Sequence, residues 1–144
     1  MMRIGFSKDI HRIVEGRPFI LGGIKIDTNY GLLGHSDADA LLHAIAESLL
    51  GALSLGDLGS HFPDNDPKYK GIDSKILLRH VYDLILEKGY MIVNIDAMVY
   101  AEEPKMKPYI PLMIESISNV LNISVEQISI KATTYEKIDA IGRK

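Results

Sequence analysis

Hydrophobic residues recur at helical spacing in three separate stretches of this chain, and this pattern limits the fold more than any other feature. The stretches predict helices over residues 37–54, from an N-cap at Asp73 or Ser74 as far as Gly89, and over residues 110–121. The apolar positions that carry the pattern are Leu42, Ala46, Leu49, Leu53, Leu77, Val81, Leu84, Ile85, Ile110, Met113, Ile114, Ile117, Val120 and Leu121. Three amphipathic helices require another layer to cover their apolar faces.

Strand-like segments lie before and between these helices. Residues 3–13 and 19–26 are β-prone and are separated by a turn with glycine and proline, which predicts a hairpin. Residues 90–100 and 128–133 alternate between apolar and polar side chains, which predicts two further strands. Residues 56–71 contain two prolines and show no periodicity, so we expect a loop. The order β-β-α-α-β-α-β predicts an α+β sandwich with helices on one face of a sheet.

Composition and charge exclude several classes of protein. The chain has 144 residues, 47% of them apolar and 24% charged, so we expect a single globular domain over residues 1–144. It contains no cysteine, which excludes disulfides and thiolate metal sites. Its formal net charge of −3 gives no general attraction to nucleic acid or anionic lipid. The apolar stretch 38–55 is too short and polar to span a bilayer, and charges interrupt the N-terminus early. We therefore expect a cytoplasmic protein with no nucleic-acid or membrane partner.

Three side chains form a candidate metal site. Asp9 and His11 are separated by one residue in a predicted strand, so their side chains leave the same face and could hold one ion. His43, in the first predicted helix, is the natural third ligand, and Asp39 one turn earlier could orient its imidazole ring. Two histidines and one carboxylate with an open position are common around a zinc ion that polarises substrate. On spacing alone, a hydrogen-bonded core histidine is the stronger explanation of His43.

Other polar groups have both a functional and a structural explanation. His35 and Ser36 lie where the first helix is expected to begin, and Ser36 begins a pattern typical of a capping box. Free N–H groups there could bind phosphate, although Ser36 can also be only a cap. Asp64 and its loop neighbours could bind a polyol or a hard cation, or could simply be solvated. Thr134 and Glu136 follow the last strand and could contact a phosphoryl oxygen and Mg²⁺, although threonine is also ordinary in strands.

These segments, in this order, resemble the 2-C-methyl-D-erythritol 2,4-cyclodiphosphate synthases of the non-mevalonate isoprenoid pathway. The match covers nearly the whole chain, and six collinear motifs are far more specific than one. The motifs are residues 3–5 with 9–11, residues 31–39 with His43, residues 56–59, residues 62–67, residues 101–108, and residues 131–134 with 136–137. With this resemblance, the metal site becomes the favoured interpretation.

The resemblance implies a homotrimer of ferredoxin-like α/β subunits, with a mixed sheet and three active sites between neighbouring subunits. The family's substrate is 4-diphosphocytidyl-2-C-methyl-D-erythritol 2-phosphate. Its 2-phosphate attacks the β-phosphorus, which closes a cyclic diphosphate and expels CMP. Carried onto this chain, Asp9, His11 and His43 would hold Zn²⁺. Glu136 would hold Mg²⁺ or Mn²⁺ together with the substrate diphosphate.

The resemblance also implies catalytic and substrate-binding residues. His35 and Thr134 would be catalytic, because they would stabilise the charge of the in-line transition state. The substrate-binding residues that it implies are Asp9, Ile10, His11, Ser36, Asp57, Leu58, Gly59, Phe62, Pro63, Asp64, Asn65, Asp66, Ala101, Glu102, Glu103, Pro104, Lys105, Met106, Lys107, Thr133, Tyr135, Glu136, Ala140 and Arg143.

The chain departs from the family pattern at three places. Residues 6–8 read Phe-Ser-Lys where the family has a glycine-aromatic step, and Ala140 stands where the family often has an aromatic residue. The chain ends at Lys144, where the family continues into a further strand, so we expect the domain to lack that strand. These departures keep a second function open, a non-catalytic module on the same scaffold that binds cytidine nucleotides or isoprenoids. The two-histidine, one-carboxylate set alone would also suit a zinc phosphohydrolase.

Overall fold

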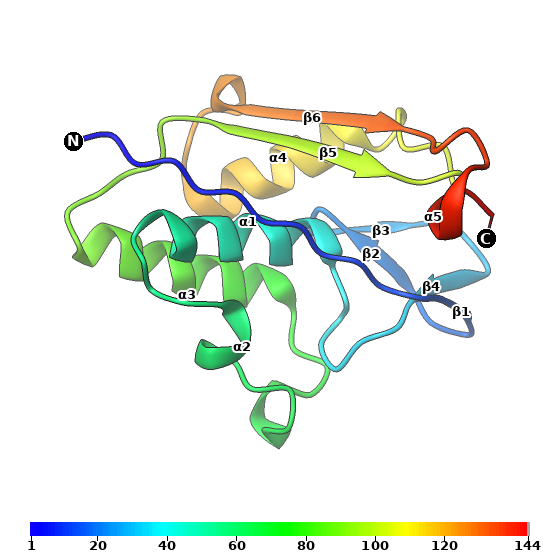
Figure 1. Cartoon of the computed structure of the whole chain (residues 1–144), viewed down its shortest axis with the longest axis horizontal. Coiled ribbons are helices and arrows are strands. Elements are labelled where there is room, and N and C mark those ends of the chain that lie inside the picture. Colours follow the sequence, from blue (N-terminus) through cyan, green and yellow to red (C-terminus); the bar gives the residue numbers. More distant parts are fainter. Residues whose placement is uncertain (144) are drawn as a thin grey trace.

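A computed structural model describes residues 1–143 and has an α+β architecture (Figure 1). The helices are α1 (Ala40–Ala52), α2 (Leu58–His61), α3 (Ser74–Glu87), α4 (Ile110–Leu121) and α5 (Asp139–Arg143), with short 3₁₀ helices η1 (Pro67–Tyr69) and η2 (Val125–Gln127). The strands are β1 (Ile13–Glu15), β2 (Phe19–Leu21), β3 (Ile24–Ile26), β4 (Tyr30–Leu32), β5 (Ile95–Tyr100) and β6 (Ile128–Thr133). Lys144 lies outside the described residues, and the expectation that the domain lacks the family's last strand stays a prediction.

The three long helices are confirmed, and their ends follow local chemistry. Asp39 caps α1 by accepting a hydrogen bond from Leu42 N, and Asp73 caps α3 in the same way. Asn122 ends α4 with a left-handed backbone at φ 54°, as predicted. The predicted capping box at Ser36 is wrong. Because Asp39 supplies the cap, the helix begins later than expected, and the Ser36 hydroxyl accepts a hydrogen bond from Ala38 N instead.

The strands form three separate two-stranded sheets within residues 1–143, where the sequence predicted one. β1 pairs with β4 and β2 pairs with β3, both antiparallel, whereas β5 and β6 are parallel. The predicted hairpin between residues 3–13 and 19–26 is therefore wrong. Gly22 and Gly23 both have positive φ and make a tight turn inside the second segment, so this segment pairs with itself. Residues 1–12 are assigned to no strand.

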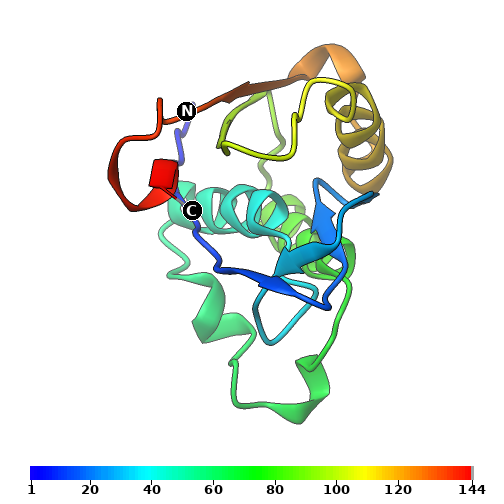
Figure 2. The ribbon, with the colours of Figure 1, turned by 90° about the vertical axis from the view of Figure 1, so that its right-hand side faces the viewer.

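The β5–β6 pair forms a layer over α1 and α4, and α3 packs against the other side of α1 (Figures 1 and 2). The helices thus cover one face of this pair, as predicted. Residues 90–94 do not extend β5: Met91 and Val93 are 76% and 64% exposed, and Ile92 is buried instead. One cluster of buried side chains joins the layers, with Leu42, Leu78 and Ile117 among its least exposed members.

Residues 56–71, which the sequence predicted as a loop, contain two short helical turns, α2 and η1. Asp57 caps α2 and Asp66 caps η1, each by accepting a hydrogen bond from a backbone N–H group. The prolines and caps explain why this segment has no hydrophobic period but is still ordered locally. In the described part of the chain, no helix is long and apolar enough to cross a membrane.

Candidate metal centre and active-site cleft

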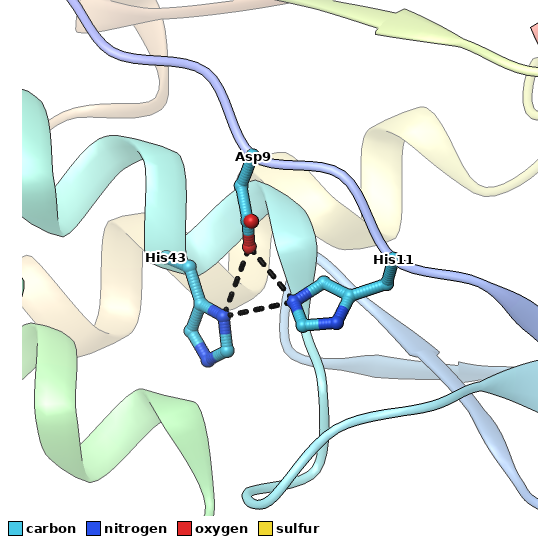
Figure 3. Close-up of side chains that lie close together, drawn as sticks. All are labelled: Asp9, His11 and His43. Carbon is cyan, nitrogen blue, oxygen red and sulfur yellow. Dashed lines mark hydrogen bonds and ion pairs between the residues drawn. The ribbon is translucent and has the colours of Figure 1, made fainter. Parts of the chain in front are cut away.

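Asp9, His11 and His43 meet as predicted (Figure 3). Asp9 Oδ2 lies 2.9 Å from His11 Nε2 and 3.1 Å from His43 Nδ1, and the two nitrogens are 3.4 Å apart. Asp9 and His11 come from the segment before β1, which is not a strand as predicted, and His43 comes from the first turn of α1. The cluster therefore joins the N-terminal segment to the central helix.

The three atoms suit a divalent cation. His11 Nδ1 lies 2.7 Å from the Leu33 carbonyl oxygen, which can only accept, so Nδ1 carries the proton and, in the neutral ring, Nε2 has a lone pair available for a cation. Two ligands of a tetrahedral zinc with bonds of about 2.0–2.1 Å lie roughly 3.3 Å apart, close to the observed spacing. Two neutral imidazoles and a carboxylate are also the nitrogen and oxygen donors that zinc accepts.

The electrostatics of the cluster agree with a cation site. Burial opposes ionisation of Asp9, but the neighbouring imidazoles of His11 and His43 outweigh it and hold the pKa of Asp9 well below its usual range. The hydrogen bond to Asp9 also raises the pKa of His11. The cluster thus attracts positive charge, and a metal ion would compete there with a proton.

His43 has a different supporting partner from the one predicted. Asp39 does not orient its ring, because the Asp39 carboxylate accepts hydrogen bonds from the backbone N–H groups of Gly22, Gly23 and Leu42. His43 Nε2 lies 2.8 Å from Ser74 Oγ instead. The sequence missed Ser74 in this role, since it lies at the start of another helix and no local pattern connects it to His43.

A cleft of about 260 Å³ opens beside Asp9, His11 and His43, which are called the ligand cluster from here on. The predicted site residues that line it are Asp9, His11, His35, Ser36, His43, Leu58, Gly59, Phe62 and Asp64. The predicted residues near them that do not line it are Ile10, Asp57, Pro63, Asn65 and Asp66. His35 and Ser36 do not lie at the N-terminus of α1 as predicted, because the helix begins at Ala40 and Asp39 caps it. His35 Nε2 lies instead 3.1 Å from the Asp66 carbonyl oxygen.

Gly34, Tyr69, Ile72 and Leu77 also line the cleft, although the sequence did not indicate them as site residues. At Gly34 the backbone passes so close to the His11 ring that an added Cβ would lie 3.1 Å from Cε1. Arg17 supports the loop between β4 and α1 by donating hydrogen bonds to the carbonyls of Gly34 and Ser36, each at 3.1 Å.

Glu47 is the most informative of the missed cleft residues. Its carboxylate accepts hydrogen bonds from Ser7 Oγ at 2.6 Å and from Leu58 N at 3.2 Å. It therefore ties the segment that carries Asp9 to the cleft wall formed by α2. Its place four residues after His43, on the same face of a helix, is the signal that could have found it.

We expect Glu47→Ala to lower kcat/KM about tenfold and the free energy of unfolding by about 1–2 kcal/mol. The substitution removes the hydrogen bonds to Ser7 and Leu58 and leaves Leu58 N without its acceptor. Steady-state kinetics with the diphosphocytidyl substrate that the resemblance implies, together with urea unfolding, would measure both effects. Glu87→Ala, at the exposed end of α3, is the matched control and should change neither quantity. Equal kinetics for the Glu47 variant and the control would contradict a role for this tie.

A second group of predicted residues lies at the ends of β5 and β6. A hollow of about 410 Å³ is lined there by Glu102, Glu103, Lys137, Gly142 and Arg143. Thr134 Oγ1 donates a hydrogen bond to Glu136 Oε1 at 3.1 Å, but neither residue lines the first cleft. The other predicted residues that line neither hollow are Ala101, Pro104, Lys105, Met106, Lys107, Thr133, Tyr135 and Ala140. Met106 is buried in the core.

The predicted residues thus fall into two separate groups in one chain. One contains the three clustered ligands, and the other contains Glu136. Among residues 1–143, Glu136 belongs to no group of three or more histidine and acidic side chains that could bind a metal. It would need ligands from outside this chain, such as phosphate oxygens.

The chain is similar in sequence to known proteins along nearly its whole length. A family model described as the YgbB family matches residues 2–144. A protein of Agathobacter rectalis named 2-C-methyl-D-erythritol 2,4-cyclodiphosphate synthase is 57% identical over 143 residues, which are 99% of this chain and 81% of that protein. A protein of the same name from Clostridioides difficile is 56% identical over 143 residues, 99% of this chain and 89% of that protein.

Solved structures give the same result. The IspF of Plasmodium falciparum in complex with CDP matches with a TM-score of 0.85 and 43% identity, covering 99% of this chain and 87% of that chain. The bifunctional IspDF from Campylobacter jejuni matches with a TM-score of 0.95 and 41% identity. That match covers 99% of this chain but only 38% of the bifunctional chain. On the family model and on relatives above half identity, the chain belongs to the YgbB family.

Proposed function

We propose that this chain is a 2-C-methyl-D-erythritol 2,4-cyclodiphosphate synthase. It converts 4-diphosphocytidyl-2-C-methyl-D-erythritol 2-phosphate to the cyclic diphosphate and CMP. An oxygen of the 2-phosphate forms a bond to the β-phosphorus, and the bond from that phosphorus to the bridging oxygen of the α-phosphate breaks. The electron pair leaves with CMP. The observation that carries the proposal is the convergence of Asp9, His11 and His43 beside a cleft, in a chain whose relatives bear this name.

Divalent cations are part of the proposal. Zn²⁺ would be held by Asp9, His11 and His43, and Mg²⁺ or Mn²⁺ by Glu136 with oxygens of the substrate diphosphate. Such ions act as Lewis acids that neutralise charge on phosphoryl oxygens. They would also explain how a chain with a net charge of −3 binds a polyanionic substrate.

The side chains of this protein position the substrate. Both reacting groups are phosphates and the attacking oxygen is already anionic, so the reaction depends on placement more than on a general base. His35 lines the cleft and Thr134 presents a hydroxyl at the end of β6, so each could donate a hydrogen bond to a phosphoryl oxygen. Ser36 and the α2 segment would surround the methylerythritol phosphate. Residues 101–107, with Thr133, would enclose the cytidine diphosphate, the part related to the CDP bound by the Plasmodium relative.

We further propose that the chain works as a homotrimer of ferredoxin-like subunits. The separation of the ligand cluster from the Glu136 group supports this, because two subunits can combine one group of each kind. Sedimentation equilibrium should give three times the chain mass. A subunit mixture of His43→Ala and Lys105→Ala variants should recover activity that each variant lacks alone, if each site uses both subunits. An active monomer would contradict the assembly. A cytoplasmic location stays a prediction of the sequence.

The decisive experiment follows the phosphorus products by ³¹P NMR with Zn²⁺ and Mg²⁺ present. A cyclic diphosphate with equimolar CMP supports the synthase. Tight cytidine-nucleotide binding without product would favour the non-catalytic module that the departures at residues 6–8 suggested. Linear phosphate products would favour the zinc phosphohydrolase.

A further inference from the structure

A chain of hydrogen bonds leads away from His43 on the side opposite the ligand cluster. His43 Nε2 lies 2.8 Å from Ser74 Oγ, and the Ser74 hydroxyl donates to Asp37 Oδ1. Asp37 also accepts hydrogen bonds from Ser74 N at 2.9 Å and from Asp39 N at 3.1 Å. Three parts of the fold meet here: the loop before α1, α1 itself, and the first residue of α3.

The directions of these hydrogen bonds determine where the protons of the Ser74 hydroxyl and the His43 ring lie. Three donors surround the Asp37 side chain, which accepts all three hydrogen bonds, so the single proton of the Ser74 hydroxyl points toward it. Ser74 Oγ then has only lone pairs to offer to His43, and Nε2 must carry a proton. Ser36 Oγ, at 3.1 Å, is a second oxygen near the same nitrogen. A neutral imidazole with its proton on Nε2 presents a lone pair at Nδ1, on the side of Asp9 and His11.

The proton must be held on Nε2 of His43 because Asp9 favours the other tautomer, with the proton on Nδ1. Asp9 Oδ2 lies 3.1 Å from His43 Nδ1, and a carboxylate at that distance favours a proton on Nδ1. Such a proton would occupy the position at which the ring must bind a metal. Ser74 is only 1% exposed, so water does not readily replace its hydroxyl as the partner of Nε2.

We propose that Ser74 and Asp37 are positioning residues that hold His43 in the Nε2–H tautomer and so make Nδ1 a metal ligand. The inference rests on the proposed metal site and adds two residues outside the ligand set. The two residues have distinct tasks: the Ser74 hydroxyl oxygen accepts a hydrogen bond from His43 Nε2–H, and Asp37 accepts the hydroxyl proton's hydrogen bond, which keeps that oxygen facing the ring.

Ser74→Ala is a clean test, because the backbone N–H of residue 74 can still bind Asp37 Oδ2 and tie the loop to α3. We expect its zinc affinity, measured by competition with a chromogenic chelator, to fall about 10- to 100-fold. Ser74→Thr restores the hydroxyl and should recover most of that loss. The matched control is Ser118→Ala on α4, which removes a serine hydroxyl that donates a hydrogen bond to the Ile123 carbonyl, and it should bind zinc normally.

The tautomer is observed directly by ¹⁵N NMR of the histidines in the metal-free protein at pH 8. We expect a proton on Nε2 of His43 in the wild type and a shift toward Nδ1–H in Ser74→Ala. A wild-type ring with its proton on Nδ1 overturns the proposal, even if the variant does not fold. Unchanged zinc affinity in a folded Ser74→Ala protein also overturns it. Because neither readout uses turnover, a protein that binds zinc in this way but forms no cyclic product would contradict only the proposed function.

Discussion

Asp9→Ala should lower kcat/KM about 10³-fold or more while the protein stays folded. Asp9 supplies the only carboxylate of the ligand cluster, and it bridges both histidines (Figure 3). Without it, two neutral imidazoles remain, and the charge that balances a dication is lost. A bound metal contributes several kcal/mol to the stabilisation of a phosphoryl transition state, and each 1.36 kcal/mol corresponds to about tenfold in rate. Assays of CMP release, with zinc content measured on the same samples, would give both quantities.

The control is Asp83→Ala, which removes an exposed carboxylate that pairs with Arg79 on α3. It should keep full activity and zinc content. Because Asp9 and His43 serve one ion, the double variant Asp9→Ala/His43→Ala should be hardly less active than either single variant. Normal turnover by that double variant would end the metal assignment.

Asp39→Ala should destabilise the fold by about 3–5 kcal/mol, the largest effect on stability that we expect from one substitution. Its fully buried carboxylate accepts hydrogen bonds from Gly22 N at 2.9 Å, Gly23 N at 2.7 Å and Leu42 N at 3.0 Å. Alanine would leave these donors without an acceptor, at about 1–3 kcal/mol for each buried group, and would remove the cap of α1. Urea unfolding monitored by circular dichroism would measure the loss.

Asp39→Asn should cost about half as much. Burial raises the pKa of Asp39, and the backbone donors counter only part of that shift, so a neutral isostere avoids a buried charge. Its amide nitrogen, however, would face one backbone N–H group. The matched control is Asp73→Ala, which removes the exposed cap of α3 and should cost only about 1 kcal/mol. Similar losses for Asp39→Ala and Asp73→Ala would show that Asp39 acts merely as a helix cap.

The sequence predicted the helices well because their evidence is local. Apolar residues at helical spacing and caps such as Asp73 act within a few turns of chain. The strands were predicted less well, since their pairing depends on contacts between distant residues. β1 pairs with β4, so that Ile13 lies opposite Leu32, and no local pattern indicates this. The turn at Gly22 and Gly23 lay inside a β-prone segment that was interpreted as a single strand.

The ligand set was predictable for a different reason. Aspartate and histidine at fixed spacing indicate metal chemistry even when their surroundings are unknown. His43 was predicted as the third ligand from its place in the first helix, and the resemblance made the metal site the favoured interpretation. The supporting partners were not predictable. Asp39 is nearer to His43 in sequence, but its carboxylate is occupied by the backbone of the β2–β3 turn. Ser74, which does contact His43, is 31 residues away along the chain.

The N-terminal segment that carries Asp9 and His11 belongs to no strand, while His43 lies in the central helix. An ion that joined them would close a loop of chain between residues 9 and 43 and reduce the entropy of the unfolded state, as a disulfide cross-link does. This chain has no cysteine with which to make such a link. A cross-link made by a metal would resist reductants and yield to chelators, so the lifetime of the folded protein would depend on the free zinc around it.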